Sequence, residues 1–131
     1  MSTDSPLSAE KLAQLTAEAA LDLKAQDVVV IDIQGRSSYA DFLILASGTS
    51  DRHVVSIADN IQATLKTDHG ILPRGVEGTR EGQWVLVDLG DVIAHIFHEF
   101  TRKEYRIEEI WSEAPKRVVE DSASPELQTT P

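Results

Sequence analysis

Cysteine is absent from this chain of 131 residues. Its absence excludes a disulfide framework and any metal cluster built on thiolates. The sequence also lacks the charged and then apolar start of a secretory signal, and it has no apolar run near the roughly 20 residues that span a bilayer. Together these absences predict a cytoplasmic protein.

Positive charge is scarce as well. The sequence has 12 lysines and arginines against 22 aspartates and glutamates, which gives a net charge of -10. Nucleic-acid backbones and anionic lipids repel a surface of this sign, so neither a membrane nor a nucleic acid is an expected partner. A basic protein is the partner that this charge favours, although solubility alone is also a sufficient explanation.

Two segments have apolar residues at every third or fourth position, which is typical of amphipathic helices. The first predicted helix runs over Leu7–Gln26, with Ser5 or Ser8 as its N-cap. The second runs over Asp51–Lys66 and is closed by the following His69-Gly70. Each helix is expected to place its apolar stripe on a sheet.

Apolar, β-branched runs predict a sheet of four to five strands. Four of them are Asp27–Ile33, Phe42–Ala46, Trp84–Val87 and Val92–Phe97, and a short fifth is expected within residues 71–82. The last two of the four read as a hairpin around an Asp-Leu-Gly-Asp turn, with so few polar residues that both faces should be covered. A short helix over Glu99–Glu104 follows. The predicted fold class is α/β, with the strand order left open.

The two ends of the chain lack such patterns. Residues 1–6 read as a flexible N-terminal tail and residues 7–113 as one folded domain. Residues 114–131 are rich in proline, serine, threonine and glutamate, which predicts a disordered tail.

The turn Gly48-Thr49-Ser50 lies between a predicted strand and a predicted helix, where backbone N–H groups can bind a phosphate. Small nucleotidyl-transferring domains have a Gly-Ser at such a turn, but they also need paired carboxylates to hold magnesium. No Asp-x-Asp occurs in the sequence. Ordinary helix capping by Thr49 or Ser50 is therefore the favoured interpretation.

Asp88, Asp91, His95 and His98 have side chains that bind metals. Strand geometry argues against one shared ion, because Asp91 and His95 would stand roughly 13 Å apart on one face of a straight strand. His98 would point to the opposite face. Neither a metal nor another cofactor is therefore predicted.

Several ordered blocks resemble the ribosomal silencing factor (Iojap-related) family. The blocks are Ser37–Phe42, Ala46–Ser50, Arg52–Val54, Trp84–Asp88 and His95–Phe97, followed by Arg102, Tyr105, Glu108 and Trp111. The resemblance covers about Leu12 to Ala114. Departures are mild: Phe42 stands where the family often has Tyr, His53 where it often has Gln, and Lys103-Glu104 where a Glu-Phe pair is common.

The resemblance implies a non-enzyme that binds ribosomal protein fourteen of the large subunit. It would sterically prevent the large and small subunits from joining and so lower translation under nutrient limitation. The resemblance also implies a mixed sheet related to nucleotidyltransferase folds and a frequent homodimer. Two other classes stay open: a degenerate nucleotide-binding protein and a dimeric interaction scaffold.

The hairpin and the segment after it hold more aromatic and acidic residues than a structural hairpin needs. We therefore predict a ribosome-facing surface there, made by Trp84, Asp88, Leu89, Asp91, His95, Arg102 and Tyr105. The acidic residues would meet a basic ribosomal protein and Trp84 would anchor it. The alternative is that Trp84 is simply a core residue.

Overall fold

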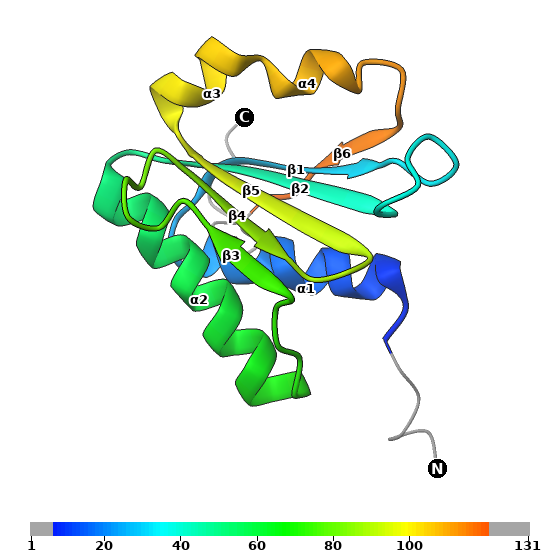
Figure 1. Ribbon diagram of the computed structural model, residues 1–131, viewed down its shortest axis with the longest axis horizontal. Coiled ribbons are helices and arrows are strands. Elements are labelled where there is room, and N and C mark those ends of the chain that lie inside the picture. Colours follow the sequence, from blue (N-terminus) through cyan, green and yellow to red (C-terminus); the bar gives the residue numbers. More distant parts are fainter. Residues whose placement is uncertain (1–6, 121–131) are drawn as a thin grey trace, which may run out of the picture.

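The structure is a computed structural model, and it describes residues 7–120, so the predicted tail at residues 1–6 lies outside the described part. One sheet has helices on both of its faces (Figure 1). In chain order the elements are α1 (Ala9–Asp22), β1 (Gln26–Asp32), β2 (Phe42–Gly48), α2 (Asp51–His69), β3 (Gly75–Glu77), β4 (Trp84–Asp88), β5 (Val92–His98), α3 (Glu99–Tyr105), α4 (Ile107–Ile110) and β6 (Lys116–Val118). The α/β class and all four principal strands are confirmed.

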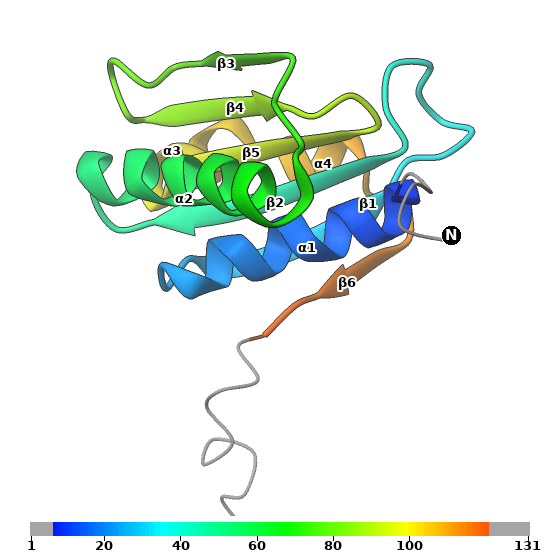
Figure 2. The same cartoon turned by 90° about the horizontal axis from the view of Figure 1, so that it is seen from below.

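The strands form one sheet in the order β3-β4-β5-β2-β1-β6, which Figure 2 shows from edge to edge. β2 and β5 are parallel, and the other neighbouring pairs are antiparallel, so the sheet is mixed. The hairpin is confirmed, since Trp84 of β4 pairs with Phe97 of β5 and Asp88 pairs with Ile93.

The sheet has six strands, so the prediction of four to five was wrong. The extra strand is β6, which pairs with Val29–Ile31 of β1. Its three residues are all exposed, and so short a segment has no apolar period to detect. The predicted disorder from residue 114 is thus wrong for residues 116–118, while residues 121–131 lie outside the described part.

The long helices begin where the capping signals predict. Ser8, not Ser5, is the N-cap of α1 and accepts the N–H of Lys11 at 3.0 Å. α1 ends at Asp22, so the predicted end at Gln26 was wrong. Lys24 takes a left-handed φ of 64°, which turns the chain out of the helix and into β1.

The end of α2 lies three residues beyond the predicted Lys66, at His69. Gly70 follows in the left-handed conformation, with a φ of 68°, and caps the helix. Between residues 7 and 120 no helix is long and apolar enough to cross a membrane.

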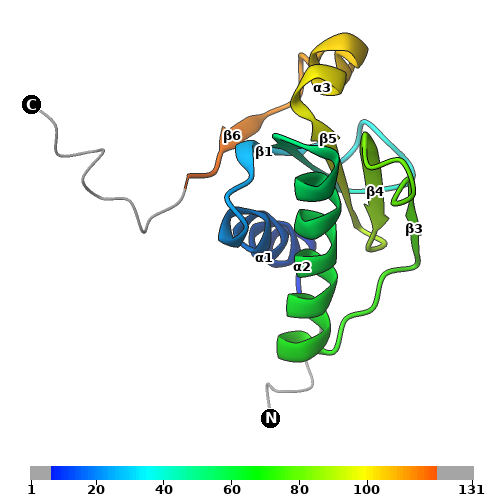
Figure 3. The same ribbon diagram turned by 90° about the vertical axis from the view of Figure 1, so that its left-hand side faces the viewer.

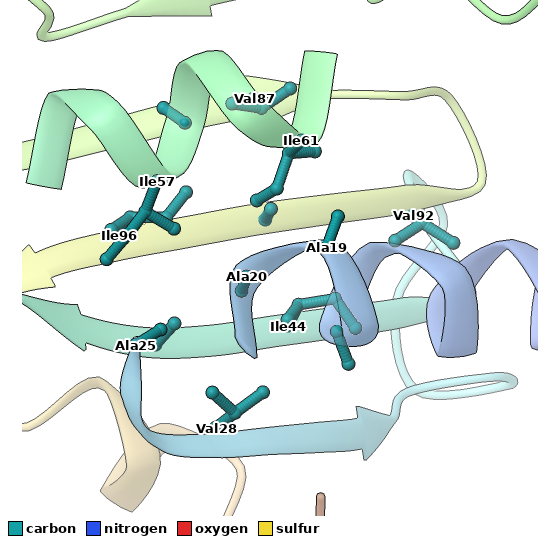
Figure 4. Close-up of a cluster of buried hydrophobic side chains, with 14 of the residues drawn as sticks. Ala19, Ala20, Ala25, Val28, Ile44, Ile57, Ile61, Val87, Val92 and Ile96 are labelled. Carbon is teal, nitrogen blue, oxygen red and sulfur yellow. The ribbon is translucent and has the colours of Figure 1, made fainter. Parts of the chain in front are cut away.

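The main core lies between the sheet and the two long helices, which pack side by side on one face (Figure 3). Figure 4 shows Ile57 and Ile61 of α2 and Ala19 and Ala20 of α1 pointing at the sheet. All four side chains are buried, and they meet alternate residues of the strands, among them Val28, Ile44, Val87 and Ile96. The apolar period of each helix therefore determines which of its faces is buried.

β4 is well covered on one face only. Val85 and Val87 are fully buried on the face that α2 covers, whereas Trp84 and Leu86 on the other face are only half-buried. The prediction of a hairpin covered on both faces was therefore wrong for β4. The short helices α3 and α4 lie on that second face and leave part of it accessible (Figure 1).

Candidate functional site

Four ring side chains meet on the face of the sheet opposite α1 and α2. We call Trp84, His95, Phe97 and Tyr105 the aromatic cluster. The centroid of the Trp84 ring lies 4.9 Å from that of Phe97, 5.1 Å from Tyr105 and 5.9 Å from His95. The register of the hairpin brings these rings together, because Trp84 is opposite Phe97 and side chains two residues apart on a strand share a face. Tyr105 is the last residue of α3.

The aromatic cluster extends from the core to the solvent. Phe97 is fully buried, Trp84 and His95 are half-buried, and 56% of Tyr105 is exposed. Partly accessible aromatic rings supported by buried neighbours are the residues that protein interfaces use as anchors. The geometry therefore suits protein recognition.

A hydrogen bond fixes the orientation of the Trp84 indole. Its Nε1–H donates to Nδ1 of His95 at 3.0 Å, so Nδ1 must be unprotonated. Burial disfavours the charged imidazolium and lowers the pKa of His95 from 6.5 to about 4. His95 is therefore neutral at neutral pH and acts as the acceptor for Trp84.

Acid is expected to destabilise the protein through His95. Between about pH 6.5 and pH 4 the unfolded chain binds a proton that the folded protein excludes, so the free energy of unfolding falls as the pH falls. The full difference corresponds to roughly 3 kcal/mol. Urea unfolding of the parent and of His95→Gln across this range measures it, since the variant should lose less stability. Equal pH dependence in both proteins would contradict the prediction.

Arg102 lies inside the protein rather than at its surface. Its side chain is only 8% exposed and makes four hydrogen bonds. Nη1 donates to the carbonyl of Asp27 at 2.7 Å and to Oγ of Ser47 at 2.9 Å. Nε and Nη2 donate to the two carboxylate oxygens of Glu108 at 3.2 and 2.9 Å. The guanidinium is thus engaged within the fold.

The hairpin tip lies at the other end of β4 from the aromatic cluster. Asp88 is four residues from Trp84, which corresponds to roughly 13 Å along a strand. Oδ1 of Asp88 accepts the N–H of Gly90 at 2.9 Å, which stabilises the turn. Leu89 is buried and belongs to the main core under the long helices, whereas Asp91 is exposed. The structure therefore divides the predicted surface into two parts.

The side chains considered as phosphate-binding or metal-binding candidates have local structural roles. Ser50 is the N-cap of α2 and accepts the N–H of His53 at 3.0 Å, which confirms capping at the Gly48 turn. Thr49 donates its N–H to Nδ1 of His53 at 2.9 Å. Nδ1 of His98 accepts the N–H of Phe100 at 3.2 Å. Within residues 7–120 no three metal-ligating side chains come together.

Sequence reasoning missed Phe97 and Glu108 as members of the site. The alternation of the hairpin could have found Phe97, because it shares a face with His95. For two of the partners of Arg102 no local signal exists, because Ser47 and Asp27 lie 55 and 75 residues away in the chain. Only the packing of α3 on the sheet brings them together.

Comparisons with known proteins agree with one another. The family model described as "Ribosomal silencing factor during starvation" matches residues 6–130. "Ribosomal silencing factor RsfS" of Halalkalibacterium halodurans is 38% identical over 109 residues, which are 83% of this chain and 92% of that protein. The protein of the same name from Bacillus subtilis is 38% identical over 106 residues, covering 81% and 89%.

A solved structure extends the likeness to the fold. The crystal structure of a Chromobacterium violaceum protein matches with a TM-score of 0.79 and 33% identity, covering 91% of this chain and 98% of that one. The family match spans nearly the whole sequence and includes both the hairpin and α3. The chain therefore belongs to the family of ribosomal silencing factors during starvation.

Proposed function

We propose that this protein binds ribosomal protein fourteen of the large subunit and prevents the small subunit from joining, which lowers translation under nutrient limitation. Membership of the family supports a role at the ribosome. The structural observation that carries the proposal is the aromatic cluster, in which Trp84 and Tyr105 stay accessible on one face of the sheet.

Two kinds of side chain would divide the work of binding. Glu104, Glu109 and Glu113 are exposed on or next to α3 and α4, and Asp91 is exposed at the hairpin tip. Ribosomal proteins are generally basic, so this charge would steer the encounter and raise the association rate. The rings of the aromatic cluster would then supply the apolar contact that slows dissociation.

Trp84→Ala and Tyr105→Ala are each expected to weaken binding to isolated protein fourteen more than tenfold, because an anchoring aromatic contributes at least about 2 kcal/mol. Tyr39→Ala is the matched control, since Tyr39 is an equally exposed tyrosine between β1 and β2 (61% against 56% for Tyr105). Asp91→Ala should act mainly on the association rate. Calorimetric titration measures the affinities, and thermal melts verify that each variant is folded.

The same experiment can place the interface elsewhere. Parent affinity in Trp84→Ala and Tyr105→Ala, together with a loss in Tyr39→Ala, would move the interface to the 37–41 turn. A loss confined to Asp91→Ala would move it to the hairpin tip.

The proposed mechanism is obstruction and needs no catalysis, cofactor or metal. It places the protein in the cytoplasm, with a homodimer as the form outside the ribosome. Co-sedimentation with isolated large subunits on a sucrose gradient is the expected result. Migration only at the top of the gradient, accompanied by magnesium-dependent nucleotide transfer, would instead favour the nucleotide-binding class.

A further inference from the structure

Arg102 joins three segments that are distant in the sequence. Its hydrogen bonds reach the start of β1 through Asp27, the end of β2 through Ser47, and α4 through Glu108. We call the paired Arg102 and Glu108 side chains the clamp. The ion pair is bidentate: the planar guanidinium donates to both carboxylate oxygens of Glu108. Lysine cannot reproduce this geometry.

Two backbone positions are shaped around the clamp. Asp27 has a left-handed φ of 51° next to an irregularity in the ladder of β1, and its carbonyl accepts from Arg102. Arg106 has a φ of 53° and separates α3 from α4, which lets Glu108 return toward Arg102. Non-glycine residues rarely adopt this conformation unless their surroundings impose it.

Besides the clamp, the short helices are held on the sheet by a hydrogen bond from Thr101 to Gln83 and by Ile107 and Trp111, which are only partly buried against it. α3 has seven residues, of which only Thr101 and Arg102 are buried, and α4 has four residues, none of them buried. Helices this short are not stable by themselves. An open pocket of about 390 Å³ lies beside the clamp, between the short helices and the strands β1, β2 and β6. Its lining residues are Asp27, Val29, Ser47, Glu99, Arg102, Lys103, Glu108 and Val118.

Tyr105 depends on the clamp for its position. It lies three residues after Arg102 and directly before Arg106, and its ring packs on Trp84 with an interplanar angle of 49°. The contact thus joins the end of α3 to β4, while Arg102 joins α3 to β1 and β2 and, through the clamp, to α4. Movement of α3 away from the sheet would separate Tyr105 from Trp84.

We propose that Arg102 is a positioning residue of the binding face: it does not touch the partner, but its clamp with Glu108 holds Tyr105 on Trp84. The role in binding rests on the proposed function, whereas the effect on the rings does not. The proposal reassigns Arg102 from a contact to a support, because four of its five N–H donors are engaged inside the protein.

The first test needs no ribosomal partner. The Trp84 indole N–H gives its own signal in a nitrogen–proton NMR spectrum, which Trp111→Phe distinguishes from the signal of the other tryptophan. Arg102→Lys and Glu108→Gln are expected to shift this signal. Glu109→Gln is the matched control, because it makes the same change in charge one residue later at an exposed position. An unmoved signal in folded Arg102→Lys and Glu108→Gln would overturn the proposal.

The second test separates support from direct contact. Arg102→Lys should weaken binding to protein fourteen about tenfold in the parent but less than about twofold in the Tyr105→Ala background, since the two changes remove the same contact. Additive losses would mean that Arg102 contacts the partner itself, and they would overturn the proposal. If Arg102→Lys does not fold, Glu108→Gln carries the same cycle.

The two tests keep the two proposals distinguishable. A parent protein that does not bind protein fourteen refutes the proposed function, and the indole signal still decides whether the clamp positions Tyr105. A parent that binds, with an indole signal unchanged by either clamp variant, refutes the positioning role alone.

Discussion

Phe97→Ala is expected to lower the free energy of unfolding by about 3–5 kcal/mol, the usual cost of removing a buried phenylalanine. The Phe97 ring is fully buried in a second, smaller core, which lies on the face of the sheet opposite the long helices and includes Ile31 and Leu43. There the centroid of the ring lies 4.9 Å from that of Trp84, and the ring stacks with His95 at an interplanar angle of 14°. Alanine would leave a cavity beneath both rings, so the aromatic cluster would lose its support together with the lost burial. Urea unfolding gives the free energy from the midpoint and the slope.

Phe100→Ala is the matched control for Phe97→Ala. Phe100 is the same residue type three positions later, but 69% of it is exposed, and its ring contacts the imidazole of His98. Its removal should change the stability by no more than about 0.5 kcal/mol. Similar losses in both variants would show that the second core is less important for stability than the burial of Phe97 indicates.

Gly78→Ala has the second large expected effect. Gly78 has a φ of +89°, and a Cβ atom added there would overlap the backbone carbonyl oxygen of Trp84. The strained conformation costs about 1–3 kcal/mol, and forcing atoms into a filled space costs a similar amount, so the loss should lie between about 2 and 6 kcal/mol. A shift of the Trp84 backbone should also be visible in its fluorescence.

Gly35→Ala separates the two causes in Gly78→Ala. Gly35 has a similar φ of +76°, but an added Cβ would meet nothing within 4 Å. Its alanine variant should therefore show only the conformational cost of about 1–3 kcal/mol, without a change at Trp84. Equal losses in the two variants would mean that the loop before β4 accommodates the extra atom.

Local signals in the sequence were sufficient for most elements. The apolar period of the long helices, the caps Ser8 and Ser50, and the β-branched runs each act over a few residues, so they can be read without knowing what packs against them. The Trp84–Phe97 hairpin could be predicted for the same reason, because its turn and both strands are contiguous.

Part of the candidate site could be predicted, and part could not. Trp84, His95 and Tyr105 lie together as expected, because hairpin register and a short link to α3 connect them. The hairpin tip lies apart from them, and Leu89 is buried in the main core, on the other face of the sheet. Which face of a hairpin is covered depends on the helices packed against it, and no residue of the hairpin encodes that.

The sequence by itself determined the two long helices, α3, the principal strands and the family, since these depend on residue order and local spacing. Only the tertiary structure decided the strand order, the edge strand β6 and the burial of Arg102. These features depend on contacts between distant segments, such as Arg102 with Asp27, 75 residues away. Such contacts form only when the whole chain packs, because one segment then supplies the partner that another segment lacks.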